Sequence, residues 1–170
     1  VMERFPNTAV LAVAGILVAL IIGIPAGIIS AKKQYSAVDN VSMVLSLIGV
    51  SMPNFWFGLL VVIVFALNLG WLPSQGMGEG GVELLKSLVL PALTLGTGCA
   101  ATITRMTRSS MLEVIHQDYI DTAKAKGVSE RTITFRHMLK NALIPIVTAV
   151  GLQFGTLLGG AMLTETVFSW

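Results

Sequence analysis

The chain has 170 residues, of which 54% are hydrophobic and 12% are charged, and its formal net charge is +2. Soluble domains carry about 25% charged residues, so this composition argues against a water-soluble protein and indicates a membrane protein. Cys99 is the single cysteine, which excludes a disulfide within this sequence and a metal site built from several cysteines.

Four stretches of the sequence lack Asp, Glu, Lys, Arg and His: residues 8–31, 40–78, 87–104 and 141–164. A charged side chain at the centre of a membrane helix costs about 2.5 to 3.5 kcal/mol, so uncharged runs of about 20 residues are typical of membrane spans. The sequence therefore predicts an all-α fold, a polytopic transmembrane helix bundle in a single domain. The expected spans are residues 8–30, 40–69, 87–104 and 141–164.

The second of these spans contains a proline near its middle. As one straight helix, residues 38–69 would measure about 48 Å against a hydrocarbon core of about 30 Å. Proline lacks a backbone donor and disfavours helix at the preceding residue, so a kink or break is expected at Met52 and Pro53. We favour a single crossing divided there. The alternative, a re-entrant hairpin, would place Lys33 and Glu79 on the same side of the membrane.

Basic residues are distributed unevenly among the connecting segments. Nine of the eleven Lys and Arg residues lie in segments 31–39 and 105–140, whereas segment 70–87 carries one lysine beside two glutamates. Short cytoplasmic loops are enriched in Lys and Arg. The two basic segments are therefore predicted to be cytoplasmic, and segment 70–87 to lie outside.

Small residues recur every four positions in the first and last spans. The two sets are Gly15, Ala19, Gly23 and Gly27, and Gly151, Gly155 and Gly159. Such spacing lets two helix backbones approach closely and predicts two packing faces, although glycines could also let helices bend during a transport cycle.

Two polar residues near the last span are candidate pathway or gate residues. Gln153 lies near the middle of the span, where a side-chain amide needs a partner, and interhelical hydrogen bonding is favoured over a role in the solute path. Glu165 lies just beyond the outer end of the span, where it is either solvated or part of an outer gate.

The segment 105–140 is too long for a simple connection. Asp118 is expected to cap a helix over residues 119–126, with Asp121 completing a capping-box-like arrangement and Gly127 ending the helix in a left-handed conformation. Ser129 is expected to cap a second helix. This helix-turn-helix suits either docking into a cleft of another protein or contact with anionic lipid.

Motifs of catalysis and nucleotide binding are absent from the sequence. It contains no Gly-x-x-x-x-Gly-Lys-Ser/Thr, His-Glu-x-x-His or Gly-x-Ser-x-Gly pattern, and His116 and His137 both lie in the segment 105–140. The spans also lack the ring of charges or the carbonyl filter of a channel. We therefore predict no catalytic, cofactor or metal residue and no nucleic-acid partner, and we disfavour a membrane-embedded enzyme and a passive channel.

Residues 118–127, Asp-Tyr-Ile-Asp-Thr-Ala-Lys-Ala-Lys-Gly, followed by residues 137–145, His-Met-Leu-Lys-Asn-Ala-Leu-Ile-Pro, resemble the EAA loop of ABC-importer permeases, in its peptide and nickel branch. The stretches 51–56, 105–112 and 165–170 resemble further parts of the same branch. The last of them is more similar to the first of the two permease subunits of such systems than to the second.

This resemblance implies the type I importer permease fold and an EAA loop whose helices sit in a groove of a cytoplasmic ATPase. By position, Asp121 stands for the glutamate of the general motif, Thr122 and Ala123 for its two alanines, and Gly127 for its glycine. Asp118 and Tyr119 belong to the same loop. Residues 137–140 also differ from the general motif, in the way usual for the peptide branch.

The resemblance also implies partners and a location. These are cytoplasmic ATP-binding subunits, a second homologous permease subunit forming a heterodimer, and an extracytoplasmic solute-binding protein, assembled in the bacterial inner membrane. A peptide is the expected solute, with nickel, glutathione or an oligosaccharide as alternatives. Compared with complete family members, the first transmembrane helix, most of an outer segment and the final helix are expected to be missing.

Overall fold

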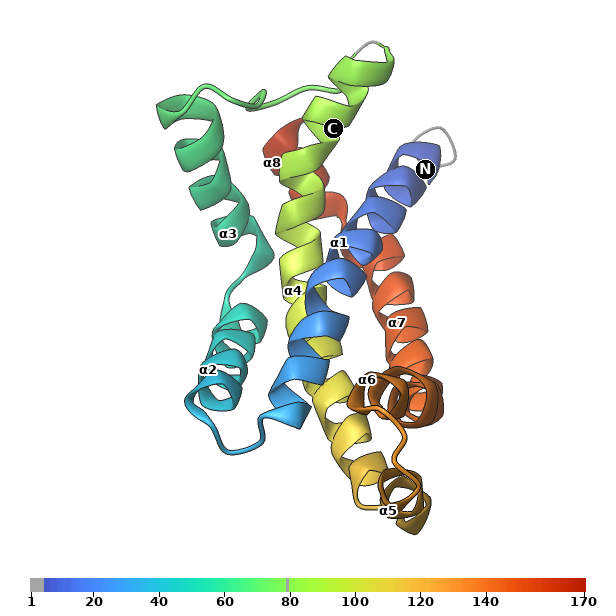
Figure 1. Cartoon of the computed structure of the whole chain (residues 1–170). Coiled ribbons are helices and arrows are strands. Elements are labelled where there is room, and N and C mark those ends of the chain that lie inside the picture. The colour runs from blue at the N-terminus through green and yellow to red at the C-terminus, as the bar shows by residue number, and fades with distance from the viewer. Residues whose placement is uncertain (1–4, 79) are drawn as a thin grey trace.

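The computed structural model describes residues 5–78 and 80–170, and these residues form helices and connections without a β-strand. Three long helices, α1 (Phe5–Lys32), α4 (Gly81–Ile115) and α7 (Lys140–Gly160), run along one another (Figure 1). Helix α1 and the helical stretches 81–115 and 130–159 are each long and apolar enough to cross a membrane. The predicted all-α helix bundle is confirmed.

Helices α1 and α4 pack through the glycine face predicted for the first span. A Cβ added at Gly23 would lie 2.9 Å from the Ala100 carbonyl oxygen, and one added at Gly27 would lie 2.5 Å from Thr107 Cβ. Gly15, Ala19, Gly23 and Gly27 are all buried. The two backbones therefore approach as closely as the absence of side chains allows, and this predicted packing face is confirmed.

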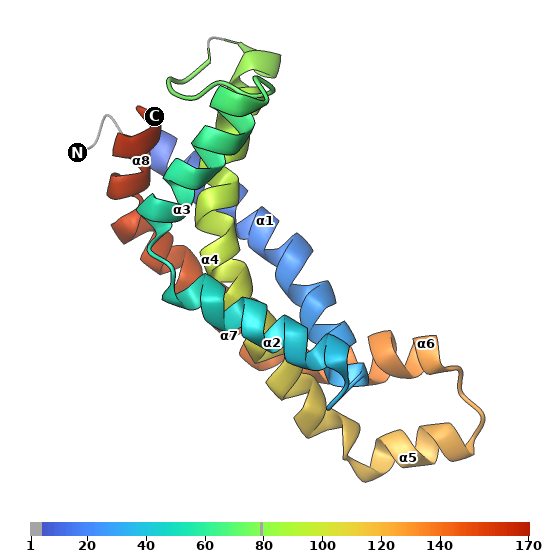
Figure 2. The ribbon, with the colours of Figure 1, turned by 90° about the vertical axis from the view of Figure 1, so that its left-hand side faces the viewer.

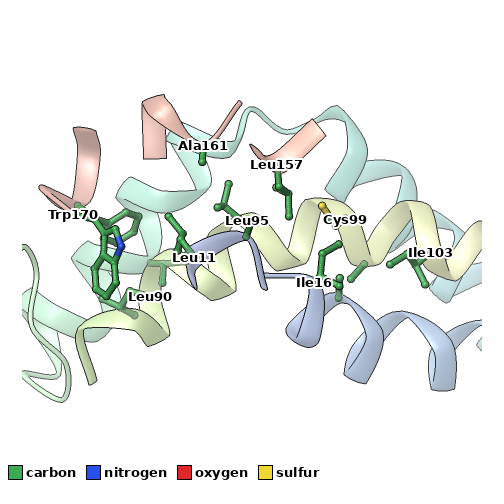
Figure 3. Packing of buried hydrophobic residues seen from close by; sticks show 14 residues of the cluster. Leu11, Ile16, Leu90, Leu95, Cys99, Ile103, Leu157, Ala161 and Trp170 are labelled. Atoms are coloured by element: carbon green, nitrogen blue, oxygen red, sulfur yellow. The ribbon is translucent and has the colours of Figure 1, made fainter. Parts of the chain in front are cut away.

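Apolar side chains from α1, α4, α7 and the C-terminal end form one core. Leu11 and Ile16 of α1 meet Leu95 and Ile103 of α4, and Leu157 of α7 closes the cluster (Figure 3). Leu11 and Ile103 are fully buried. The core thus holds α1, α4 and α7 together along much of their length.

The second predicted glycine face does not pack within the described chain. Gly151, Gly155 and Gly159 are exposed, and a Cβ added at any of them would meet no atom within 4 Å. Helix α7 instead turns Ile146 and Leu157 toward the rest of the bundle. The sequence pattern identified a small-residue face correctly, but not one that another described helix covers.

The second apolar run is broken at its proline. It forms α2 (Ala37–Ser51), α3 (Asn54–Val61) and the π-helical turn η1 (Val62–Asn68), with a bend of 104° at the break. Met52 has extended backbone dihedrals, and Pro53 precedes the first residue of α3. The pair begins beside the end of α1 and finishes at the end of the bundle where α4 begins (Figures 1 and 2).

The helices on either side of the segment 105–140 extend further than the sequence predicted. Helix α4 continues past residue 104 to Ile115, and its 35 residues measure about 52 Å. Beyond α5 (Asp118–Ala125), α6 (Glu130–Thr132) and η2 (Ile133–Leu139) run directly into α7. The second helix expected in this segment is thus the start of the last long helix. That helix ends at Gly160, before residue 164, and α8 (Met162–Phe168) follows it.

Candidate coupling helix and solute path

Helix α5 lies with α6 at the end of the bundle opposite to α8 and to the beginning of α1 (Figure 1). The helix covers Asp118–Ala125 and thus begins one residue earlier than the expected range 119–126. Gln117, and not Asp118, is the N-cap, and the Gln117 side chain makes no capping hydrogen bond. Asp118 and Asp121 both lie in the first turn, where carboxylates are favoured by the helix dipole. The Asp121 carboxylate contacts the Lys124 ammonium at 3.2 Å rather than completing a capping box.

The turn after α5 has the predicted geometry. Gly127 adopts a left-handed conformation with φ of 73°, and its N–H donates to the Lys124 carbonyl at 2.9 Å. Ser129 is the N-cap of α6, because its side-chain oxygen accepts from the Thr132 N–H. Both of these predictions are confirmed, and the two caps fix the angle at which the chain returns to the bundle.

The inner face of α5 is anchored in a second hydrophobic cluster. Ile120 is fully buried and Ala123 is 7% exposed. The cluster brings them together with residues of α1, α4, η2 and α7: Ile28, Ala31, Met111, Ile133, Met138, Ala142 and Ile146. Helix α5 therefore packs on η2, which runs directly into α7, and the cluster continues from there to the ends of α1 and α4. A displacement of α5 acts first on η2 and the beginning of α7.

The outer face of α5 is polar and uncovered by the rest of the described chain. Tyr119 is 41% exposed, and Asp118, Asp121, Thr122 and Lys124 are exposed as well. Six residues were assigned above to the EAA loop. The structure places Ala123 against the bundle, Gly127 in the turn after α5 and the other four on one accessible surface.

A partly buried ion pair between α2 and α4 was not expected from the sequence. The Arg108 guanidinium of α4 donates two hydrogen bonds to the Asp39 carboxylate of α2, from Nε at 2.6 Å and from Nη2 at 2.7 Å. Asp39 is 1% exposed. Asp39 is the only acidic residue near the basic pair Lys32 and Lys33 in the sequence. This isolated carboxylate was the one feature of the sequence from which an ion pair could have been expected.

The local chain conformation prepares the Asp39 carboxylate for this pairing. Ser36 is the N-cap of α2 and places Asp39 in its first turn. The Ser30 hydroxyl and the Tyr35 N–H also donate to the carboxylate. Both partners of the ion pair lie outside the charge-free runs, and the Asp39 carboxylate accepts from Arg108, Ser30 and Tyr35 together.

Glu165, in α8, lines a cavity at the opposite end of the bundle. The cavity has a volume of about 600 Å³ and is also lined by Asn7, Met77, Met162, Thr166, Ser169 and Trp170. The Thr8 hydroxyl donates to Glu165 Oε1 at 2.6 Å, which ties α8 to the beginning of α1. A partly exposed carboxylate at this position can accept a hydrogen bond from a solute or neutralise a cationic group.

Gln153 does not share this cavity. It lies in α7, separated from Glu165 by the end of that helix at Gly160, and it is partly exposed. Its side-chain amide makes no hydrogen bond to another residue in the described ranges. The two candidate pathway residues are therefore not brought together by the chain itself.

Comparison with known proteins places these features in a family. The model of the binding-protein-dependent transport system inner membrane component matches residues 23–170. The oligopeptide transport system permease protein AppB of Bacillus subtilis (strain 168) is 44% identical over 175 residues, covering 100% of this chain and 55% of the relative.

Two further relatives are similarly close. The dipeptide transport system permease protein DppB of Alkalihalophilus pseudofirmus is 47% identical over 186 residues, covering 96% of this chain and 56% of its own length. The glutathione transport system permease protein GsiC of Escherichia coli (strain K12) is 44% identical over 168 residues, covering 99% of this chain and 53% of its own length. The chain spans about half the length of these relatives. It belongs to the family of binding-protein-dependent transport system inner membrane components and forms part of a multi-pass membrane protein.

Proposed function

We propose that this chain forms the central part of a permease subunit of an ATP-driven importer, and that α5 is the helix that docks on a cytoplasmic ATPase. The observation that carries the proposal is the position of α5. Its apolar face is seated through Ile120 and Ala123 on η2, which runs directly into α7, in a cluster that also includes residues of α1 and α4. Its polar face is uncovered by the described chain. A short helix held in this way can transmit a push or pull to the membrane helices.

The charge distribution supports the sidedness required by this function. The end of the bundle that carries α5 also carries the connection between α1 and α2 and the last part of α4 (Figure 1). Most of the basic residues lie in these segments, including Lys32, Lys33 and Arg108. Short cytoplasmic loops are enriched in such residues. We therefore assign residues 31–39 and 105–140 to the cytoplasmic side, and the cavity at Glu165 to the outer side. In this assignment α2, α3 and η1 form one broken crossing.

Peptide-like solutes are the cargo that we propose. Permeases named for oligopeptide, dipeptide and glutathione transport are 44 to 47% identical to this chain over the aligned residues. Glutathione is itself a small peptide, so these names agree on the chemical class. Nickel and oligosaccharides remain alternatives. Glu165 is proposed as a gate residue at the outer end of the path, and Gln153 as a polar group along it.

The proposed assembly places ATP hydrolysis on other chains. It consists of ATP-binding subunits on the cytoplasmic side, a second permease subunit, and an extracytoplasmic solute-binding protein. The exposed glycine face of α7, around Gly155, is available to a neighbouring helix of such an assembly. No catalytic step is assigned to this chain, whose part is to hold the solute path and to change the side to which it opens.

Cysteine cross-linking tests the docking of α5. In the full-length permease assembled with its partner subunits, Thr122→Cys and Ala125→Cys are expected to form adducts with the ATPase, because both positions are exposed. The matched control is Ala123→Cys, which lies on the same helix but is buried against the bundle. Adduct yield at Thr122 should change between ATP-bound and nucleotide-free states. Equal yields at Thr122 and Ala123, or no adduct at any of the three positions, would contradict the proposal.

A further inference from the structure

The Asp39 carboxylate joins three helices at the end of the bundle that carries α5. It accepts hydrogen bonds from Ser30 of α1 and from Arg108 of α4, and it belongs itself to α2. Arg108 lies in the part of α4 that continues to α5 with only His116 and Gln117 between them. A movement of α5 that displaces this part of α4 therefore displaces Arg108 as well.

Helix α2 packs along α4 and α1 without burying an apolar side chain. Asp39 and Ser46 are its buried residues, and none of its apolar side chains is buried. The backbone of α2 also approaches α4 closely at Gly49, where an added Cβ would lie 3.1 Å from Ala101 Cβ. The bidentate contact with Arg108 fixes both distance and orientation, which a contact between apolar side chains does not. The ion pair is thus the principal directional tether of α2.

Helix α3 is held separately, by the other end of the bundle. A Cβ added at Gly58 would lie 3.2 Å from atoms of Phe168 in α8 and of Thr94 in α4. Figure 2 shows α2 and α3 lying along different parts of α4. Between them, Pro53 has no N–H to donate, and Met52 is extended, so the angle between α2 and α3 is not fixed by a continuous helical hydrogen-bond ladder.

We propose that the Asp39–Arg108 ion pair makes α2 move with the α5-bearing part of α4, so that a displacement of α5 by the ATPase reaches the second crossing and is taken up at the break between Met52 and Pro53. This inference rests on the proposed docking of α5. Asp39 and Arg108 are positioning residues, because they act through the helices that they join and need no contact with solute or nucleotide.

The test uses the full-length permease, assembled with its partner subunits in proteoliposomes and carrying Thr122→Cys as a reporter of docking. Asp39→Asn and Arg108→Gln are each expected to lower the transport rate about tenfold, because a tenfold change lies within the usual range for loss of coupling between two sites. ATP hydrolysis and the Thr122 adduct should persist, so that hydrolysis continues without transport. Lys33→Gln, which removes an exposed charge from the connection between α1 and α2, is the matched control and should leave transport unchanged.

The outcomes separate this inference from the docking proposal. Absence of the Thr122 adduct in the otherwise unchanged permease contradicts the docking of α5 itself. Presence of the adduct with unchanged transport in Asp39→Asn and Arg108→Gln overturns the inference alone. If these two variants fail to assemble, Arg108→Lys keeps the charge but loses the bidentate geometry. Reduced transport by an assembled Arg108→Lys permease supports the inference, whereas full transport, or failure of this variant to assemble, overturns it.

Discussion

Replacing Gly27 with alanine is expected to lower the thermal stability of the permease strongly. The new Cβ would lie 2.5 Å from Thr107 Cβ and 2.8 Å from the Thr104 carbonyl oxygen, both on α4. A backbone oxygen cannot rotate away as a side chain can, so α1 and α4 must separate. Overpacking of a well-packed core costs about 1 to 3 kcal/mol, and we expect the upper end of that range here.

The measurement is the temperature at which the detergent-solubilised complex loses its monodisperse state. Val13→Ile provides the control, because it also adds one methyl group to α1 but at a side chain that is 49% exposed. The transition temperature of Val13→Ile should equal that of the unchanged protein, whereas the transition temperature of Gly27→Ala should be lower. Equal transition temperatures for the two variants would show that α1 and α4 do not approach in the way described.

Replacing Ile120 with alanine is expected to abolish coupling while leaving the membrane helices in place. Ile120 is fully buried between α5 and the bundle, and truncation of a buried isoleucine costs about 2 to 5 kcal/mol. Helix α5 has eight residues, too few to be stable in water without its packing. Loss of this anchor should therefore detach or unfold α5, and transport should stop.

Ile120→Val provides the conservative comparison, since it removes one methyl group and costs about 0.5 to 1.5 kcal/mol. Transport and ATP hydrolysis in proteoliposomes, together with the Thr122→Cys adduct, would be measured for both variants. We expect Ile120→Val to retain most transport and Ile120→Ala to lose both transport and the adduct, with insertion into the membrane unchanged. Full transport by Ile120→Ala would contradict the role given to the inner face of α5.

The features that could be predicted from the sequence are those set by lipid and by local backbone geometry. Lipid excludes charge, so the uncharged runs coincide with apolar helical segments, and Pro53 marks a break because its ring removes a donor within the run. Gly127 and Ser129 occupy the turn and cap positions expected of them, since these preferences depend on a few neighbouring residues.

The residues at which the helices begin and end could not be predicted from the positions of charged residues. Arg105 and Arg108 mark the edge of an uncharged run, but α4 continues to Ile115 because its next turns still bury Thr107 and Met111 against the bundle. A charged residue marks where lipid ends rather than where a helix ends. The N-cap at Gln117 was missed for a related reason: Asp118 is a good capping residue by type, but the chain enters the helix one residue earlier.

Pairings between distant residues were also beyond the sequence analysis. Asp39 and Arg108 are 69 positions apart, and nothing in either neighbourhood specifies the other. The two glycine faces illustrate the same limit, because Gly23 and Gly155 lie in similar patterns. Gly23 packs on α4, whereas Gly155 faces open space within the described chain. A small-residue pattern predicts a face suited to close packing, and it does not identify the helix that covers it.

The central claim is that the segment carrying α5 faces the cytoplasm. Single cysteines at Thr122, in α5, and at Gln75, in the loop before α4, would be placed in the full-length permease with the buried Cys99 replaced by alanine. A membrane-impermeant maleimide applied to intact spheroplasts should label the cysteine at position 75 and should label that at position 122 only after lysis. Labelling of position 122 in intact spheroplasts would contradict the account.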